Sequence, residues 1–198
     1  MTFTIDEDGW CQQARQMLSP NHNERPEGQP VELLVIHNIS LPPGQFGGPY
    51  IADMFLNRLD CDLHPFFDQL RELRVSSHFF IRRTGELIQF VPTEKRAWHA
   101  GVSSFMGREG CNDFSIGIEV EGSDFVPFEP AQYRTLTALT KALAARYPQM
   151  KNVTGHEHIA PVRKTDPGPF FDWAGYSQAM TVNGINLVPW FGDTSPPR

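Results

Sequence analysis

The 198-residue chain lacks the sequence features of several broad protein classes. It has no apolar run near the ~20 residues that a membrane-spanning helix needs. Its acidic N-terminus does not show the positive segment followed by an apolar stretch that marks a secretory signal. Lysine and arginine are too few for a nucleic-acid or anionic-membrane binder, because 17 of them face 23 Asp and Glu, a net charge of −6. We therefore expect a cytoplasmic protein with no nucleic-acid partner and no membrane association.

Cysteine is scarce as well, and this argues against the common cysteine-based sites. The three cysteines, Cys11, Cys61 and Cys111, lie far apart and form no CxxC pair. They predict free, buried thiols in a reducing compartment rather than a disulfide framework. The chain also has no HExxH motif, so it contains neither a CxxC-based nor an HExxH zinc motif.

Composition and length indicate one folded domain. Hydrophobic residues make up 40% and aromatic residues 12% of the chain, which is typical of a globular protein. We expect a single domain over residues 1–198, partly irregular over 1–30 and 185–198. We also expect a monomer, because the predicted elements leave no apolar stripe without a core to fill.

Hydrophobic periodicity predicts an α/β protein with a mixed β-sheet flanked by helices. A hairpin is indicated where two β-rich runs flank Thr84 and Gly85. The clearest helix begins near Pro130, because proline suits the first helical turn and an apolar stripe follows it. The predicted strands lie at 31–37, 77–91 (as the hairpin), 114–122 and within 148–158, and the predicted helices at 8–18, 50–60 and 129–147.

The strand predicted over 114–122 carries two carboxylates on one face. Ile116, Ile118 and Val120 alternate with residues that include Glu119 and Glu121, which is the period-two pattern of a strand. Either carboxylate could serve as a general base. A solvated sheet face would explain both carboxylates equally well.

Two of the seven histidines follow predicted strands and border a possible cleft. His37 ends a buried strand before a Gly/Pro-rich loop, and His156 follows the last predicted strand. Asp166 lies on a stiff turn, because it precedes Pro167. Catalytic zinc typically takes three ligands of the His and carboxylate type, so His37, His156 and Asp166 could form a metal site. Hydrogen-bonded structural histidines and an aspartate that caps its own turn remain the alternative. Lys164 is a surface cation or a second group of the same cleft.

Four segments closely resemble the AmpD-type 1,6-anhydro-N-acetylmuramyl-L-alanine amidases, and they occur in the family's order. The likeness extends from about residue 5 to residue 174, and the segments read LLVIHNISLPPGQFGGP, KRAWHAGVS, GCNDFSIGIEVEG and TGH…IAP.RKTDPGPFFDW. The wider group comprises zinc amidases that include T7-lysozyme-type amidases and peptidoglycan recognition proteins. The resemblance implies their mixed sheet flanked by helices. It also implies hydrolysis of the amide between 1,6-anhydro-N-acetylmuramic acid and L-alanine of muropeptides, in peptidoglycan recycling.

The family's motifs also assign roles to positions of this chain. The resemblance implies that Zn²⁺ is held by His37, His156 and Asp166. It implies that Glu119, the first glutamate of its strand, is the catalytic base, and that Lys164 stabilises the oxyanion. The implied partner is a small anhydromuropeptide.

The same resemblance implies a substrate groove. Asn38, Arg74, Ala97 and Trp98 match positions that line the groove in the family. Trp98 is expected to stack on the sugar. Arg74 is expected to pair with a peptide carboxylate, because a guanidinium fork has the matching geometry.

Two positions depart from the family's pattern. Gly110 stands where family members carry an arginine that is expected to contact the acidic end of the peptide. We expect an altered peptide preference unless Arg108 compensates. His158 stands where the family commonly has aspartate, which makes it a candidate for an extra or competing ligand.

Two rival functions use the same resemblance. A muropeptide-binding module without catalysis would be indicated by loss of a ligand or of the glutamate, and all are present. A secreted or phage amidase that attacks intact wall would fit a secretory signal or a basic wall-binding extension, and the sequence shows neither.

Overall fold

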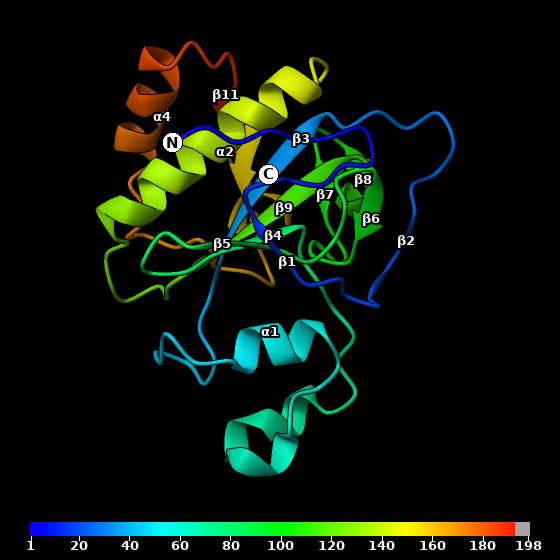
Figure 1. Ribbon diagram of the computed structural model, residues 1–198, viewed down its shortest axis with the longest axis vertical. Coiled ribbons are helices and arrows are strands. Elements are labelled where there is room, and N and C mark those ends of the chain that lie inside the picture. The colour runs from blue at the N-terminus through cyan, green and yellow to red at the C-terminus, as the bar shows by residue number, and fades with distance from the viewer. Residues whose placement is uncertain (193–198) are drawn as a thin grey trace, which may run out of the picture.

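A seven-stranded mixed sheet runs through the computed structural model, which describes residues 1–192 (Figure 1). Neighbouring strands pair in parallel, except that β4 and β5 form the predicted antiparallel hairpin. This arrangement confirms the α/β fold expected from the sequence. The strand order is β1 (Arg15–Gln16), β5 (Leu87–Gln89), β4 (Phe79–Ile81), β9 (Ser115–Glu121), β3 (Leu33–Ile39), β10 (Asn152–Gly155) and β11 (Val188–Trp190).

The central strand β9 pairs in parallel with β3 and with β4, and it is buried on both faces because the chain covers both sides of the sheet. Ile116, Ile118 and Val120 point to one face and join the largest hydrophobic cluster. Glu119 and Glu121 point to the other face. The predicted alternation is therefore correct, but the alternative of a solvated carboxylate face is wrong, since all seven residues of β9 are buried.

Helices α2 (Pro130–Arg146) and α4 (Trp173–Val182) lie together on one side of the sheet (Figure 1). The α2 helix begins as predicted, and Gln132 accepts a hydrogen bond from the Glu129 backbone at 2.9 Å, which satisfies an orphan donor of the first turn. The α4 helix was not predicted from the sequence. It buries only Tyr176 and Met180, so its apolar stripe is too short to stand out.

The chain between β3 and β4 lies on the other side of the sheet and contains α1 (Tyr50–Phe55) (Figure 1). Phe55 and Phe67 pack there against Phe80 and Phe90 in a second hydrophobic cluster. The helix predicted over 50–60 is shorter than expected, because Asn57 adopts a left-handed backbone with φ of 56°. Two short 3₁₀ helices follow at Cys61–Leu63 and Pro65–Leu70.

The N-terminal segment corrects one prediction and places the first cysteine. The helix predicted over 8–18 is wrong: the chain instead turns and forms β1, which pairs in parallel with β5. The Cys11 backbone donates to the Gln89 side chain at 2.6 Å, which holds this segment against the sheet edge. All three cysteines are buried free thiols, as expected.

Short elements complete the described chain, and the sequence did not predict most of them. They are β2 (His22–Glu24) paired with β6 (Lys95–Ala97), β7 (Ser104–Phe105) paired with β8 (Arg108–Glu109), a 3₁₀ helix at Cys111–Asp113, and α3 (His156–Ile159). In the region expected to be partly irregular, 185–198, β11 covers three residues, and 193–198 lie outside the described part. No helix among residues 1–192 combines the length and apolar character that crossing a bilayer requires.

The packing of α2 on the sheet predicts the effect of one core truncation. Leu139 is fully buried in the cluster between them. Leu139→Ala should lower the free energy of unfolding by about 2–5 kcal/mol in denaturant titrations, because it leaves a cavity. Lys141→Ala, on the exposed side of the same helix, should change it by less than about 0.5 kcal/mol. Similar losses in both variants would contradict this account of the core.

Candidate active site

The carboxyl ends of three parallel strands bring the predicted site residues to one edge of the sheet. His37, near the end of β3, lies directly opposite Glu119 of β9. His156 immediately follows β10, and β10 pairs with the other side of β3. Parallel strands end at the same edge, where α/β proteins commonly bind ligands.

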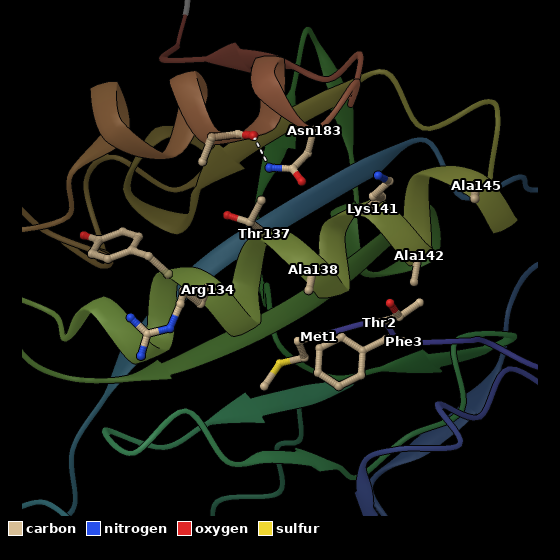
Figure 2. Close-up of a pocket in the computed structure, with 12 residues that line it drawn as sticks. Met1, Thr2, Phe3, Arg134, Thr137, Ala138, Lys141, Ala142, Ala145 and Asn183 are labelled. Atoms are coloured by element: carbon tan, nitrogen blue, oxygen red, sulfur yellow. Dashed lines mark hydrogen bonds between the residues drawn. The ribbon is translucent and has the colours of Figure 1, made fainter.

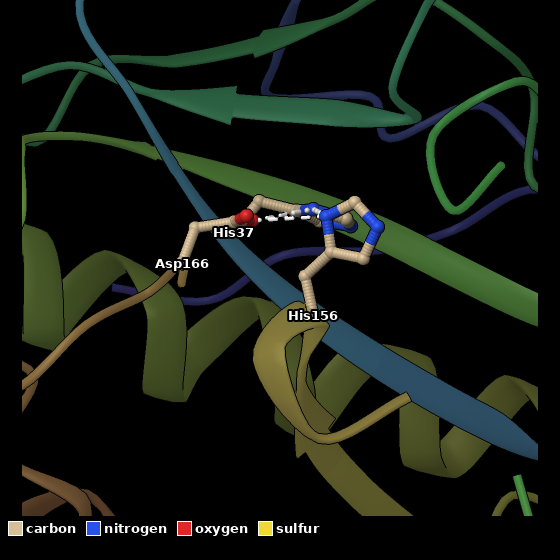
Figure 3. Close-up of side chains that lie close together, drawn as sticks. All are labelled: His37, His156 and Asp166. Atoms are coloured by element: carbon tan, nitrogen blue, oxygen red, sulfur yellow. Dashed lines mark hydrogen bonds and ion pairs between the residues drawn. The ribbon is translucent and has the colours of Figure 1, made fainter. Parts of the chain in front are cut away.

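His37, His156 and Asp166 converge at this edge (Figure 3). His37 Nδ1 lies 3.0 Å from His156 Nδ1 and 3.0 Å from Asp166 Oδ2, and His156 Nδ1 lies 3.1 Å from the same oxygen. Tetrahedral zinc with ligands at about 2.0–2.2 Å separates them by about 3.3–3.5 Å. The three donor atoms are therefore close to the spacing that a shared zinc ion requires.

Burial sets the charge state of His37, and contacts with the two histidines set that of Asp166. The His37 side chain is buried, and burial together with the neighbouring His156 lowers the pKa of His37 to about 4. The imidazole is therefore neutral at pH 7, with one nitrogen lone pair to offer. Burial opposes ionisation of Asp166, but its contacts with His156 and His37 outweigh burial and hold its pKa below the ordinary value. An ionised carboxylate beside neutral imidazole is a donor set that suits zinc.

The loop that carries Asp166 is held by hydrogen bonds at Asp166 itself and at the next residue. The Glu157 backbone donates to the Asp166 carbonyl at 2.8 Å. The Asn38 side chain donates to the Pro167 carbonyl at 3.0 Å and to Asp124 at 2.7 Å. These bonds tie the loop to β3, so the carboxylate reaches the histidines from a held backbone.

Glu119 is a buried carboxylate with an unsatisfied oxygen. The residue is 9% exposed, and among residues 1–192 its Oε2 has no hydrogen-bond partner. Burial raises the pKa of Glu119 well above its ordinary value, Asp166 adds to the rise, and Lys164 opposes it. A carboxyl group with a raised pKa that lines a cleft is a candidate for proton exchange with a bound molecule.

Glu121 has a different environment, although it lies on the same face of β9. Its two carboxylate oxygens accept backbone hydrogen bonds from Gly47 at 2.6 Å and from Arg83 at 2.9 Å. Glu121 therefore joins the loop after β3 to the β4–β5 hairpin. The structure assigns it a structural task and leaves Glu119 as the carboxylate of the cleft.

A cavity of about 580 Å³ opens onto these groups, a volume that is typical of small-molecule sites. Lys164 lines it beside Asp166 and Glu119. Trp98 and Arg74 line another part, where the Trp98 indole donates to Asn23 at 2.6 Å and Arg74 donates to two backbone carbonyls of its own loop. An apolar wall comes from α1, from the 3₁₀ helix at Pro65–Leu70 and from the loop after it: Met54, Phe55, Phe66, Leu70 and Leu73.

Of the four residues predicted to line a substrate groove, three line the cavity and one does not. Asn38, Arg74 and Trp98 line the cavity. Ala97 is fully buried on β6, paired with His22, and is absent from the lining of that cavity.

Sequence reasoning missed two partners of the histidine pair. His37 Nε2 lies 2.9 Å from His99 Nδ1, and His156 Nε2 lies 3.0 Å from the Ala100 carbonyl. Both residues fall in KRAWHAGVS, a segment that carried the family resemblance. The available signal was a histidine next to two assigned positions.

The two departures from the family's pattern lie outside the metal cluster. Gly110 has a left-handed backbone with φ of 72° and lines a separate hollow that borders the cavity at Gly101. His158 Nδ1 accepts from the Gly155 backbone at 3.2 Å, and its ring packs on Trp173. His158 is thus engaged elsewhere, and the cluster of metal-ligating side chains does not include it.

Another hollow, of about 620 Å³, lies between the N-terminal residues and α2 (Figure 2). Met1, Thr2 and Phe3 form one wall, and alanines with Arg134 and Lys141 form the other. The residues that line it include no carboxylate, histidine or cysteine. The groups able to bind a metal or transfer protons therefore gather at the sheet edge and not in this hollow.

Comparisons with known proteins agree with the architecture of this edge. Residues 27–169 match the family model described as N-acetylmuramoyl-L-alanine amidase. The 1,6-anhydro-N-acetylmuramyl-L-alanine amidase AmpD of Escherichia coli is 57% identical over 171 residues, which cover 86% of this chain and 93% of the relative. A crystal structure of a selenomethionine derivative of AmpD superposes with a TM-score of 0.85 at 55% identity, covering 87% of this chain and 97% of that one.

One similar solved structure holds a substrate. It is the N-acetylmuramyl-L-alanine amidase AmiD of E. coli in complex with anhydro-N-acetylmuramic acid-L-Ala-D-γ-Glu-L-Lys. It superposes with a TM-score of 0.58 at 31% identity, covering 93% of this chain and 66% of that one.

The contrasting environments of the two glutamates predict losses of stability that differ in size. Glu121→Ala leaves two backbone donors without their acceptor and should lower the free energy of unfolding by about 1–3 kcal/mol. Glu119→Ala removes a buried carboxyl group with an unsatisfied oxygen and should lower it by less than about 0.5 kcal/mol. Chemical denaturation at pH 7 measures both. A larger loss for Glu119→Ala than for Glu121→Ala would refute this division of roles.

Proposed function

The chain belongs to the N-acetylmuramoyl-L-alanine amidase family, and on that premise we propose how it hydrolyses the amide between 1,6-anhydro-N-acetylmuramic acid and L-alanine in peptidoglycan recycling. The observation that carries the proposal is Glu119, a buried carboxylate with an unpartnered oxygen, which lines the same cavity as His37, His156 and Asp166. One set of groups can hold a metal and the other can move a proton. Amide hydrolysis needs both.

Zinc is the proposed cofactor, held by His37, His156 and Asp166. Three protein ligands leave a coordination position open, as catalytic zinc sites do. When bound, zinc supplies Lewis acidity, which makes water more acidic and polarises a carbonyl group. The spacing of the three donor atoms, close to that of tetrahedral zinc, and the burial of the two histidines support this choice.

Glu119 is the proposed base. Its carboxylate accepts a proton from the attacking water as the oxygen–carbon bond forms at the lactyl carbonyl. The same carboxyl group then returns that proton to the alanine nitrogen as the carbon–nitrogen bond breaks, so the products are the anhydro sugar acid and a free peptide amine. The raised pKa that burial gives Glu119 favours proton acceptance. Lys164, on the same cavity wall, is the proposed electrostatic partner of the developing oxyanion.

The remaining cavity residues are proposed to bind the substrate, a small anhydromuropeptide. Trp98 offers an aromatic face to the sugar, and Arg74 offers a guanidinium to a peptide carboxylate. Asn38 both holds the Asp166 loop and lines the cavity. Ala97 is the buried last residue of β6, and we propose that it acts by positioning Trp98, which follows it. We further propose a monomeric, single-domain enzyme of the cytoplasm.

The zinc proposal predicts how much zinc the protein holds when one of the three proposed ligands is replaced. The purified protein should hold about one zinc per chain, lose turnover on chelation and regain it when zinc is restored. His156→Ala should bind little zinc, because a ligand is gone. His158→Ala is the matched control: it removes a histidine two positions away that lies outside the cluster, and it should keep its zinc. Metal analysis after gel filtration decides, and a full zinc complement in His156→Ala would exclude this ligand set.

The base proposal predicts a loss of turnover without a loss of metal. Glu119→Gln should keep zinc and lower kcat by about 10²–10⁴-fold, because the amide does not accept the proton. Glu121→Gln, on the same strand face, should retain kcat. Mass spectrometry of products from anhydromuropeptides and from intact cell wall gives the rates and the cleaved bond. Near-normal turnover by Glu119→Gln, or release of peptide from intact wall alone, would contradict the proposal.

A further inference from the structure

Both proposed histidine ligands contact one short segment, which consists of His99 and Ala100. His37 Nε2 contacts His99 Nδ1 at 2.9 Å, and His156 Nε2 contacts the Ala100 carbonyl at 3.0 Å. These nitrogens are the ones that do not face Asp166. We propose that this segment fixes the tautomer and ring orientation of both ligands, and that His99 is the positioning residue of His37. The inference rests on the proposed metal role of these histidines.

The tautomer of His156 follows from its single outer contact. A carbonyl oxygen only accepts hydrogen bonds, so His156 Nε2 donates to Ala100. In a neutral imidazole the other nitrogen then carries the lone pair. That nitrogen, Nδ1, is the atom 3.1 Å from Asp166 Oδ2.

The tautomer of His37 follows from a longer chain of hydrogen bonds, which also ends at a backbone carbonyl. Ser115 Oγ lies 2.5 Å from the Cys111 carbonyl, so the hydroxyl donates there. The same oxygen then accepts from His99 Nε2 at 3.2 Å. Neutral His99 must accept at Nδ1, and therefore His37 donates from Nε2. The lone pair of His37 Nδ1 is left facing His156 and Asp166. This chain of bonds favours a proton on His37 Nε2 over the competing order, in which Nδ1 would donate to Asp166 Oδ2 at 3.0 Å.

The fold holds His99 in this place by two further constraints. Its ring fills the space above Gly117 of β9, where an added Cβ would lie 2.5 Å from the ring. Its backbone N–H and that of Ala100 both donate to Asn112 Oδ1, at 3.0 and 2.8 Å. A fixed backbone and a fitted ring leave the imidazole little freedom. Gly117 and Asn112 are therefore part of the support for His37.

The consequence is a prepared metal site. A histidine in the wrong tautomer would place a proton on the nitrogen that must bind the metal. Moving that proton to the other nitrogen costs free energy and lowers metal affinity. Outer partners of ligand histidines typically contribute 10–100-fold to metal affinity. We assign a contribution of that size to His99.

Paired substitutions at His99 test the proposal. His99→Leu removes the acceptor and should weaken zinc binding about 10–100-fold in competition with a chromophoric chelator. His99→Asn places an oxygen at the δ position and should restore most of the affinity. His64→Asn is the control: His64 Nδ1 accepts a bond from the Phe66 backbone, far from this chain of bonds and outside the cavity lining, so zinc affinity should stay within about twofold of wild type.

A second readout needs no zinc. Nitrogen NMR of the zinc-free protein should show His37 protonated at Nε2 in wild type and His99→Asn, and a mixture of tautomers in His99→Leu. Unchanged zinc affinity and an unchanged His37 tautomer in His99→Leu would overturn the inference while leaving the zinc proposal standing. Wild-type protein that binds no zinc would overturn the metal centre, and the tautomer of His37 would still decide the positioning role.

A variant at the far end of the chain of bonds covers the case in which His99→Leu does not fold. Ser115→Ala removes the acceptor of His99 Nε2 without altering His99 itself. It should weaken zinc binding several-fold, to an extent below the 10–100-fold effect of direct outer partners, and broaden the tautomer population of His37. Wild-type affinity together with a single Nε2 tautomer in this variant would count against the proposal.

Discussion

The parallel pairing of β3 with β9 on one side and β10 on the other is the constraint on which the whole site depends. It sets His37 opposite Glu119 and delivers His156 at the end of the next strand. Because side chains alternate along a strand, a slip of one residue in β9 would exchange Glu119 for an aliphatic neighbour and turn the carboxylate toward α2. Backbone hydrogen bonds thus decide which groups meet, before any side chain interacts with another.

The sheet also separates two energetic tasks. One face carries the aliphatic residues of β3 and β9 against α2 and α4, which is the main source of hydrophobic stabilisation. The other face carries the buried ionisable groups, including a glutamate whose oxygen is unsatisfied. Desolvating such groups costs free energy. A large apolar face across the same strands offsets that cost without altering the cleft.

How much the sequence could reveal depended on whether a feature is local. The α2 helix, the hairpin and the alternation in β9 depend on residues close together in the sequence, and they were predicted correctly. The choice of Glu119 over Glu121 is not local, since it depends on which strand neighbours β9 and on the backbone donors that occupy Glu121. Family resemblance selected Glu119, and the geometry supplies a physical reason. His99 went unassigned for the same cause: its partners lie 62 and 16 positions away. The helix expected over 8–18 failed because pairing with a sheet edge outweighed weak local helical preference.

The long reach of the Asp166 loop has a consequence for how the protein folds. His37 and Asp166 meet across 129 positions of chain, so their contact closes a loop that spans most of the molecule. The entropy lost in such a closure is large, but it grows only slowly with loop length. We therefore expect short-range contacts to form earlier and the cluster to be completed after β3 and β10 have paired. An ion seated there would act as a removable cross-link between distant parts of the chain, and its presence would mark molecules whose folding is finished.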